Sequence, residues 1–165
     1  LKSNYFLPHL ELSVFYQLKG DQDNAIKEMQ QASVLTENSN TGVVFQLGVL
    51  YYRKKDFNNA QGALEYATSL DPNYANALYF LGLVYNQKGQ KQKAKEKFIR
   101  ILGLNPDNEE IKKIIANLTA GNDALAGIGA PQQSVVPNID QPPKESEKLQ
   151  TENPLTPEKS TKKKK

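Results

Sequence analysis

The sequence contains no cysteine and a single histidine, His9. Disulfides, zinc–thiolate sites and thiol nucleophiles are therefore excluded, and a cluster of imidazole ligands cannot form. No apolar run approaches the roughly 18 residues that a membrane-spanning helix needs. Lysine and arginine number 21 against 18 acidic residues, so the net charge of +3 is too small to indicate nucleic acid as the main partner. We expect no metal site, no cofactor and no enzymatic activity.

Aromatic residues are missing from the last part of the chain. All 14 lie between Tyr5 and Phe98, whereas six of the nine prolines follow Thr119. Such a segment buries too little apolar area to offset the entropy of ordering it. We therefore expect residues 120–165 to be a disordered tail that contains proline and lysine. Because the chain starts at Leu1 and not at methionine, we expect residues 1–5 to be a truncated N-terminal end, so that the chain is a fragment.

Residues 6–119 contain an internal repeat of 34 residues. The positions that recur are the pairs Leu47–Leu81, Gly48–Gly82, Tyr51–Tyr85, Ala60–Ala94 and Pro72–Pro106. A weaker copy precedes them at an offset of 35, where Ser13 replaces the glycine. Recurrence of several positions at one period is typical of stacked repeat proteins. The period defines three units, near 6–40, 41–74 and 75–108.

Each unit is predicted to form two helices, since its apolar residues follow a period of 3.6. Gly20 and Gly89 mark the turn between the two helices, and Asp21 and Asp56 are expected to cap the second helix. A further helix is predicted over 107–119, with Asp107 and Glu110 as its capping box. Its apolar residues lie on one face, as the terminal helix of a stacked array requires: Ile111, Ile114, Ile115 and Leu118.

With these residues in this order, 6–119 resembles a tetratricopeptide repeat array of three repeats and a C-terminal capping helix. The resemblance implies an all-α fold, a right-handed superhelical α-solenoid. It also implies that partners bind a concave groove lined by the first helix of each repeat. The groove positions of the family fall on Leu10, Val14, Gln17, Phe45, Val49, Tyr52, Arg53, Tyr79, Leu83, Asn86 and Gln87.

These groove residues are mostly apolar, so the expected partner is a protein or peptide that offers a helix or a short hydrophobic strand. Members of the family that bind chaperone C-termini clamp a carboxylate with lysine, asparagine and arginine. This chain has Leu10, Val14, Gln46, Asn76 and Phe80 at the matching places, which argues against that role. The alternative is that a neighbouring segment, such as a missing N-terminal helix, fills the groove.

Basic residues are concentrated near the end of the third unit. Between Lys88 and Arg100 there are six lysine and arginine residues and one opposing Glu96. The only aromatic among them, Phe98, is assigned to the core by the repeat, and a nucleic-acid surface needs exposed aromatics for stacking. We interpret the run as a solvated outer face, and the run Lys162–Lys165 as a solubilising end that could also touch anionic surfaces.

Two functions are consistent with the sequence. The first is a non-catalytic interaction or scaffold module that binds a peptide or helix in its groove. The second is a C-terminal auxiliary domain of a larger bacterial envelope protein, for example a multi-span glycan polymerase or ligase, whose chemistry lies upstream. The apolar first helix and the start at Leu1 favour some upstream sequence. The compartment stays open: cytoplasmic, or envelope-associated if the chain is part of a membrane protein.

Overall fold

A computed structural model of the chain describes residues 5–128, and these residues are helical without any strand. Their helices, seven in this part of the chain, follow in order: α1 (Leu7–Leu18), α2 (Gln22–Leu35), α3 (Thr41–Arg53), α4 (Phe57–Leu70), α5 (Ala75–Gln87), α6 (Lys91–Leu104) and α7 (Glu109–Thr119). The all-α fold predicted from the repeat is confirmed, and the tail beyond residue 128 lies outside the described residues.

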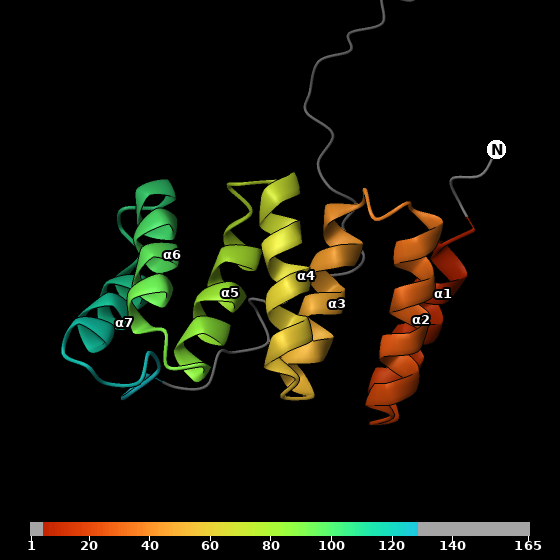
Figure 1. Cartoon of the computed structure of the whole chain (residues 1–165), viewed down its shortest axis with the longest axis horizontal. Coiled ribbons are helices and arrows are strands. Elements are labelled where there is room, and N and C mark those ends of the chain that lie inside the picture. Colours follow the sequence, from red (N-terminus) through yellow and green to blue (C-terminus); the bar gives the residue numbers. More distant parts are fainter. Residues whose placement is uncertain (1–4, 129–165) are drawn as a thin grey trace, which may run out of the picture. The chain divides into compact units, whose positions relative to one another are not determined.

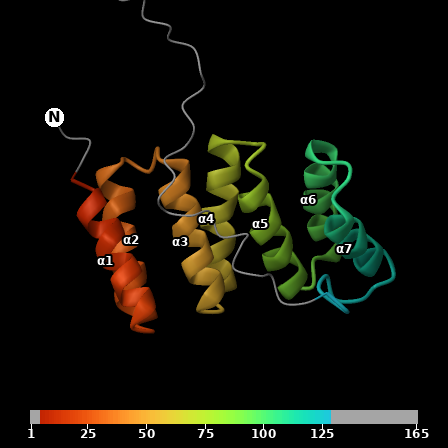
Figure 2. The ribbon, with the colours of Figure 1, turned by 180° about the vertical axis from the view of Figure 1, so that it is seen from behind.

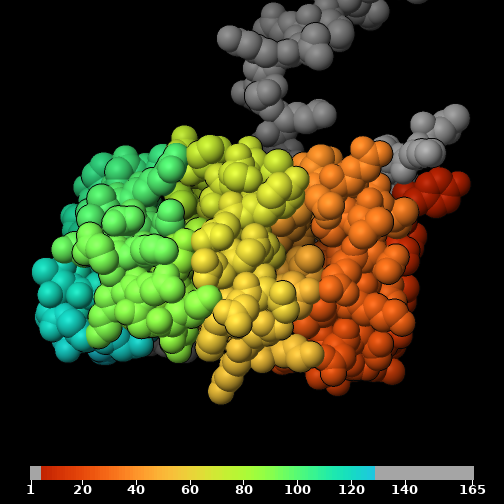
Figure 3. All heavy atoms as spheres, viewed as in Figure 1, coloured from red at the N-terminus to blue at the C-terminus, as the bar shows by residue number. Residues whose placement is uncertain are grey.

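The helices pack as antiparallel pairs, α1 with α2, α3 with α4 and α5 with α6, and α7 closes the array (Figure 1). The second helices of the pairs, α2, α4 and α6, form one layer. The first helices and α7 form the other, which faces the viewer in Figure 2. We call the surface formed by α1, α3, α5 and α7 the inner face, and the surface formed by α2, α4 and α6 the outer face. The outer face continues from one pair to the next without interruption (Figure 3).

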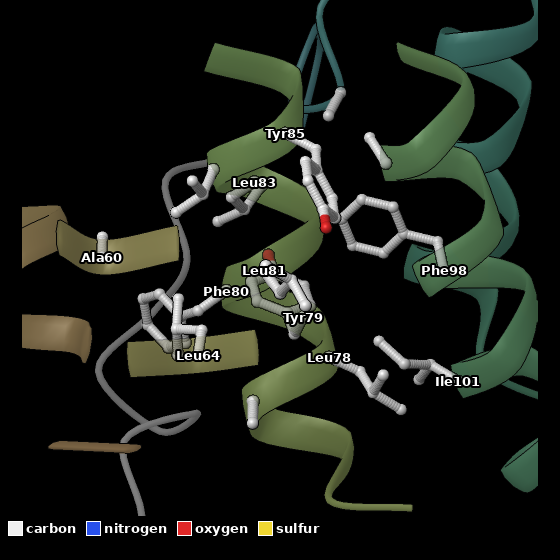
Figure 4. Packing of buried hydrophobic residues seen from close by; sticks show 14 of the residues in the cluster. Ala60, Leu64, Leu78, Tyr79, Phe80, Leu81, Leu83, Tyr85, Phe98 and Ile101 are labelled. Carbon is white, nitrogen blue, oxygen red and sulfur yellow. The ribbon is translucent and has the colours of Figure 1, made fainter. Parts of the chain in front are cut away.

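Glycine allows the close approach within the second and third pairs. A Cβ atom added at Gly48 would lie 2.7 Å from Cγ of Leu64, and one at Gly82 would lie 2.7 Å from Cε2 of Phe98. Figure 4 shows Phe98 of α6 pointing toward α5 from one side, while Leu64 of α4 lies on the other. In the first pair Ser13 takes the glycine position, and its buried hydroxyl donates to the carbonyl oxygen of Ala25 at 2.8 Å. The serine therefore fits because its hydrogen bond is satisfied.

The predicted turns and caps are largely confirmed. Gly20 and Gly89 adopt left-handed φ angles of 76° and 72°, and Lys55 takes the same conformation, with φ 63°, in the second pair. Asp21 and Asp56 accept hydrogen bonds from the backbone of Asn24 and Asn59. The capping box of the last helix is corrected: α7 starts at Glu109, and Asn108, not Asp107, accepts the bond from the Ile111 N–H.

The buried side chains fall into two clusters. The larger one, the main core, joins α3, α4, α5, α6 and α7 and includes Phe45, Leu64, Phe98 and Ile114. The smaller one, the first-pair core, joins α2 to α3 through residues such as Met29 and Leu50, with Phe6, Leu10 and Tyr16 packed against it. The first pair is therefore held to the rest of the array by a core of its own.

The boundary expected near Ala120 is corrected, because residues 121–128 form turns that pack against the helices. Ala124 is fully buried, and Leu125 and Ile128 contact the main core. Gly121 reverses the chain with φ 77°. The physical reason is that small aliphatic residues can complete a core without any aromatic, so the lack of aromatics after Thr119 set the boundary too early.

Candidate functional site

The candidate groove residues lie on the first helices of the pairs, as the repeat predicts, but most of them are buried. Phe45 and Val49 of α3 and Tyr79 and Leu83 of α5 are each exposed by at most 5%. Leu10, Val14 and Tyr52 are half-buried, and Arg53 is exposed. The apolar members contribute to the cores, because neighbouring pairs pack closely through them, and their role in binding a partner stays a prediction.

Aromatic side chains pack together where α3 meets α5. The Phe80 ring lies 5.5 Å from that of Tyr52 and 5.9 Å from that of Phe45, measured between centroids, and both pairs meet edge to face. Phe45 also meets Tyr74 at 5.0 Å. Such geometry adds about 0.5–1.5 kcal/mol per pair beyond the buried area. Phe80 and Tyr74, which sequence reasoning did not place in this cluster, therefore stabilise the interface between the second and third repeats.

Tyr79 lies where α5 meets α7. Its hydroxyl donates to Oε1 of Glu110 at 3.1 Å, and burial together with this carboxylate raises the pKa of the phenol above its usual value. Tyr79 and Glu110 line a small open pocket of about 120 Å³, together with Ala75, Asn76, Ile101, Asn108 and Ile111. Tyr79 therefore both links α5 to α7 and lines this pocket.

Polar contacts connect α1 to the neighbouring helices. Arg53 donates to Oε1 of Gln17 at 3.1 Å, which links the inner-face edges of α1 and α3. On the other side, Nδ1 of His9 lies 2.7 Å from Oε2 of Glu28 on α2. No sequence signal predicted this pair, because the two residues lie 19 positions apart on different helices.

A group of polar contacts surrounds Asn86, near the C-terminal end of α5. Its side-chain Nδ2 donates to Oδ2 of Asp123 at 2.7 Å, and its Oδ1 accepts from the backbone N–H of Ala124 at 3.4 Å. Burial and the nearby Asp123 carboxylate raise the pKa of the Tyr52 hydroxyl. Asn86, predicted as a groove residue, therefore holds a non-helical segment of the chain itself.

A second asparagine completes this arrangement, and sequence reasoning missed it. Asn117 of α7 donates from Nδ2 to the carbonyl oxygens of Ala124 and Ala126, at 3.1 and 2.8 Å. The available signal was the run of small and apolar residues from Ala124 to Ile128 directly after the capping helix. Side-chain amides recognise a backbone well, since each offers both a donor and an acceptor.

The basic residues of the third pair lie largely on the outer face, as expected, and several of them make contacts. Lys88 donates to Asn58 and Gln61 of α4, and the ammonium groups of Lys93 and Lys97 lie over the Tyr85 ring. Tyr85 in turn donates to Glu65 at 2.6 Å. Lys88 and Tyr85 therefore link the third repeat to the second, and Lys93 and Lys97 contact Tyr85.

Two further properties concern only the residues that the structure describes. No helix in 5–128 is long and apolar enough to cross a membrane. Within the same residues, no group of three or more histidine, cysteine, aspartate or glutamate side chains could hold a metal ion.

Comparison with known proteins places residues 51–118 in the family described as "Tetratricopeptide repeat". No curated protein sequence matches the chain. Among solved structures, MamA is 26% identical and covers 76% of this chain and 70% of its own, with a TM-score of 0.66. The first repeat domain of Spaghetti (RPAP3), bound to an HSP90 peptide, is 23% identical over 72% of this chain and 94% of its own, also with a TM-score of 0.66.

A third structure is the type III secretion chaperone SycD of Yersinia enterocolitica in complex with a peptide of the translocator YopD. It is 17% identical over 76% of this chain and 93% of its own, with a TM-score of 0.61. These likenesses concern the fold, which is shared across the described helices. Residues 51–118 therefore match the tetratricopeptide repeat family, and the described helices share the fold of such repeat structures, with three helix pairs and a C-terminal capping helix.

Proposed function

We propose that the protein is a non-catalytic interaction module whose inner face binds a peptide segment of a partner protein. The observation that carries this proposal is that Asn86 and Asn117 hydrogen-bond both backbone groups of Ala124, a residue outside the helices. A surface that holds one non-helical segment in this way is suited to hold another. Two solved relatives of the same fold have peptides bound, from HSP90 and from YopD.

The proposed contact residues are those of the inner face that remain accessible. Arg53 is exposed, and Val14, Gln17 and Tyr52 are half-buried around it. Tyrosine and arginine often dominate binding energy, because each combines apolar contact area with hydrogen-bonding groups. Phe45, Val49, Tyr79 and Leu83 act by holding these helices in place.

A chaperone C-terminus is not the partner we propose. Of the five positions at which related domains clamp a carboxylate, Leu10, Val14 and Phe80 are apolar here. An apolar side chain cannot supply the donors that a carboxylate requires. An internal peptide segment, recognised through its backbone and a few side chains, fits this surface better.

A displayed library of random peptides, selected on the full chain, tests the proposal. Enriched peptides are titrated against the unmodified chain, Arg53→Glu and Lys95→Glu, which reverse one charge on the inner and on the outer face. We expect Arg53→Glu to weaken binding by about 1–3 kcal/mol. Lys95→Glu should change mainly the salt dependence, because exposed charges are screened. The opposite result would place the binding site on the outer lysine face, with an acidic partner.

An open apolar surface on α1 favours a second candidate, an auxiliary array within a longer bacterial envelope protein. Phe15 is 47% exposed, whereas Leu50 and Val84, at the same position of the later repeats, are at most 3% exposed. In those repeats the preceding pair covers this position. A polypeptide extended upstream of Leu1 should show slower amide hydrogen exchange in α1. Unchanged exchange would count against this candidate.

A further inference from the structure

Residues 121–128, which we call the strap, pack against Asn86 and Asn117, near the C-terminal ends of α5 and α7 (Figure 2). We propose that the strap is an internal ligand that competes with the partner peptide, and that the partner carries an acidic residue followed directly by a small one. This inference rests on the proposed function, since it assigns the chemistry of the same surface. The sequence of the strap is Gly-Asn-Asp-Ala-Leu-Ala-Gly-Ile.

The helices bind the strap through its backbone. The N–H of Ala124 donates to Oδ1 of Asn86, and its carbonyl oxygen accepts from Nδ2 of Asn117. Backbone groups are common to every peptide, so a segment of another chain could make the same two bonds. The two asparagines, one from α5 and one from α7, therefore form a general clasp for one residue of a peptide.

Asp123, the acidic residue before Ala124, accepts hydrogen bonds at both of its carboxylate oxygens. Oδ2 of Asp123 accepts from Asn86 at 2.7 Å, while its Oδ1 accepts from the N–H of Leu125 at 2.9 Å. Each oxygen of the carboxylate therefore has a donor. A hydrogen bond to a charged group is about twice as strong as one between neutral groups. Asn86 consequently favours a peptide with a carboxylate just before the clasped residue.

The position of Ala124 restricts the size of the side chain that it can hold. Ala124 is fully buried in the main core, whereas Leu125 and Ile128 are only partly buried against it. A larger side chain at the clasped position would have to displace packed atoms of the helices, which is unfavourable in a close-packed interior. The surface thus selects a small residue at this position and tolerates aliphatic residues one and four positions later.

The strap is also built so that it can leave without unfolding a helix. It starts directly after α7 through Gly121, and Gly127 also adopts a left-handed φ, of 66°. Asp123 and Ala126 are exposed, and the hydrogen bonds within the strap close short turns such as that from the Ala126 N–H to the Asp123 carbonyl. Besides the two asparagines, Lys91 of α6 donates to the Gly121 carbonyl oxygen, and the N–H of Asn122 donates to the Asn117 carbonyl oxygen.

The test uses the full chain with Ala124→Glu, which should expel the strap because a charged, longer side chain cannot occupy the buried position. The probe is a fluorescent synthetic octapeptide with the sequence of residues 121–128, blocked at both ends, followed by fluorescence anisotropy. We expect the probe to bind the Ala124→Glu chain at least about tenfold more tightly than the unmodified chain, where the attached copy competes. The same octapeptide with glutamate in place of its first alanine should not bind.

Asp123→Ala provides a second variant that leaves the buried position untouched, in case Ala124→Glu fails to fold by circular dichroism. Because Asp123 is exposed, its loss weakens the strap without opening the core, and the probe should again bind more tightly than to the unmodified chain. Absence of probe binding to a folded variant would overturn the proposal. Equal binding to variant and unmodified chain would also overturn it, since the attached strap would then not compete.

The library selection separates this inference from the proposed function. Repeated on the Ala124→Glu chain, it should enrich peptides with an acidic residue before a small one, and these should displace the probe. A different outcome is that the enriched peptides bind both chains equally and leave the probe in place. This result would support the proposed function and refute the role of the strap as a competitor. A selection that enriches nothing on either chain, while the probe binds, would refute the proposed function and the inferred partner chemistry, and would retain the strap only as an internal ligand.

Discussion

At the residue scale, the turn between the two helices of each pair shows how the same backbone is built from different residues. Gly20 and Gly89 supply the left-handed conformation in the first and third pairs, and Lys55 supplies it in the second. A side chain with a Cβ atom in this conformation costs roughly 1 kcal/mol relative to glycine. The second turn is therefore less favourable than its two counterparts.

This difference predicts that Lys55→Gly stabilises the protein. We expect the free energy of unfolding, measured by urea denaturation, to rise by about 1 kcal/mol, because the strain is removed. Gly89→Lys is the matched control and should lower stability by a similar amount. Its position has open space around it, so only the backbone conformation is at issue. A loss of stability in Lys55→Gly would show that the lysine side chain makes a stabilising contact.

Residues whose role is local were well predicted from the sequence. Asp21 and Asp56 were identified as caps, because a cap depends only on residues within one turn. The roles of Tyr79 and Asn86 were not predicted. Their position on the inner face was, but the burial of each side chain depends on the residues that pack against it. For Tyr79 that is Glu110, and for Asn86 it is the strap, and both come from distant parts of the chain.

At the element scale, the contact between paired helices depends on the absence of a side chain. Gly82→Ala should lower the free energy of unfolding by about 1–3 kcal/mol, since the added methyl group would lie against the Phe98 ring. Gly62→Ala, within α4, is the matched control, because a Cβ atom there would meet no neighbour. It should raise stability by about 0.5–1 kcal/mol through helix propensity.

Thermal and urea unfolding of the two variants measure this difference. If Gly82→Ala were as stable as the unmodified chain, the paired helices could move apart at no cost. The repeat would then not require a glycine for close approach of its two helices. The element itself was predicted from its period, since Gly48 and Gly82 recur at one spacing. The strap was not predicted, because it occurs once and no repeat marks it.

At the scale of the whole molecule, the described helices do not share one core. The first-pair core ends at α3, and α1 carries exposed Leu12 and Phe15 where later pairs are covered. In arrays of repeats, stability is the sum of each repeat and its contacts with neighbours. The first pair has one neighbouring pair, whereas the second has two.

We therefore expect the first pair to open before the rest of the array. Amide hydrogen exchange at neutral pH should be faster in α1 and α2 than in α5 and α6, because local opening follows the number of buried contacts. Leu81 and Val84, which are buried within α5 and at most 1% exposed, should be among the slowest to exchange. Equal protection throughout would show that residues 5–128 unfold as one cooperative unit.

A single turn joins the strap to α7, and this short connection sets the concentration that a competing partner needs. A segment joined by a short connection is present at its own binding surface at an effective concentration on the order of millimolar. A free peptide that made only the contacts of the strap would therefore have to approach that concentration to replace half of it. A partner at ordinary cellular levels must gain additional affinity elsewhere on the inner face, beside Tyr52 and Arg53. Partners that also contact Tyr52 and Arg53 would thus displace the strap, whereas short peptides that make only the contacts of the strap would not.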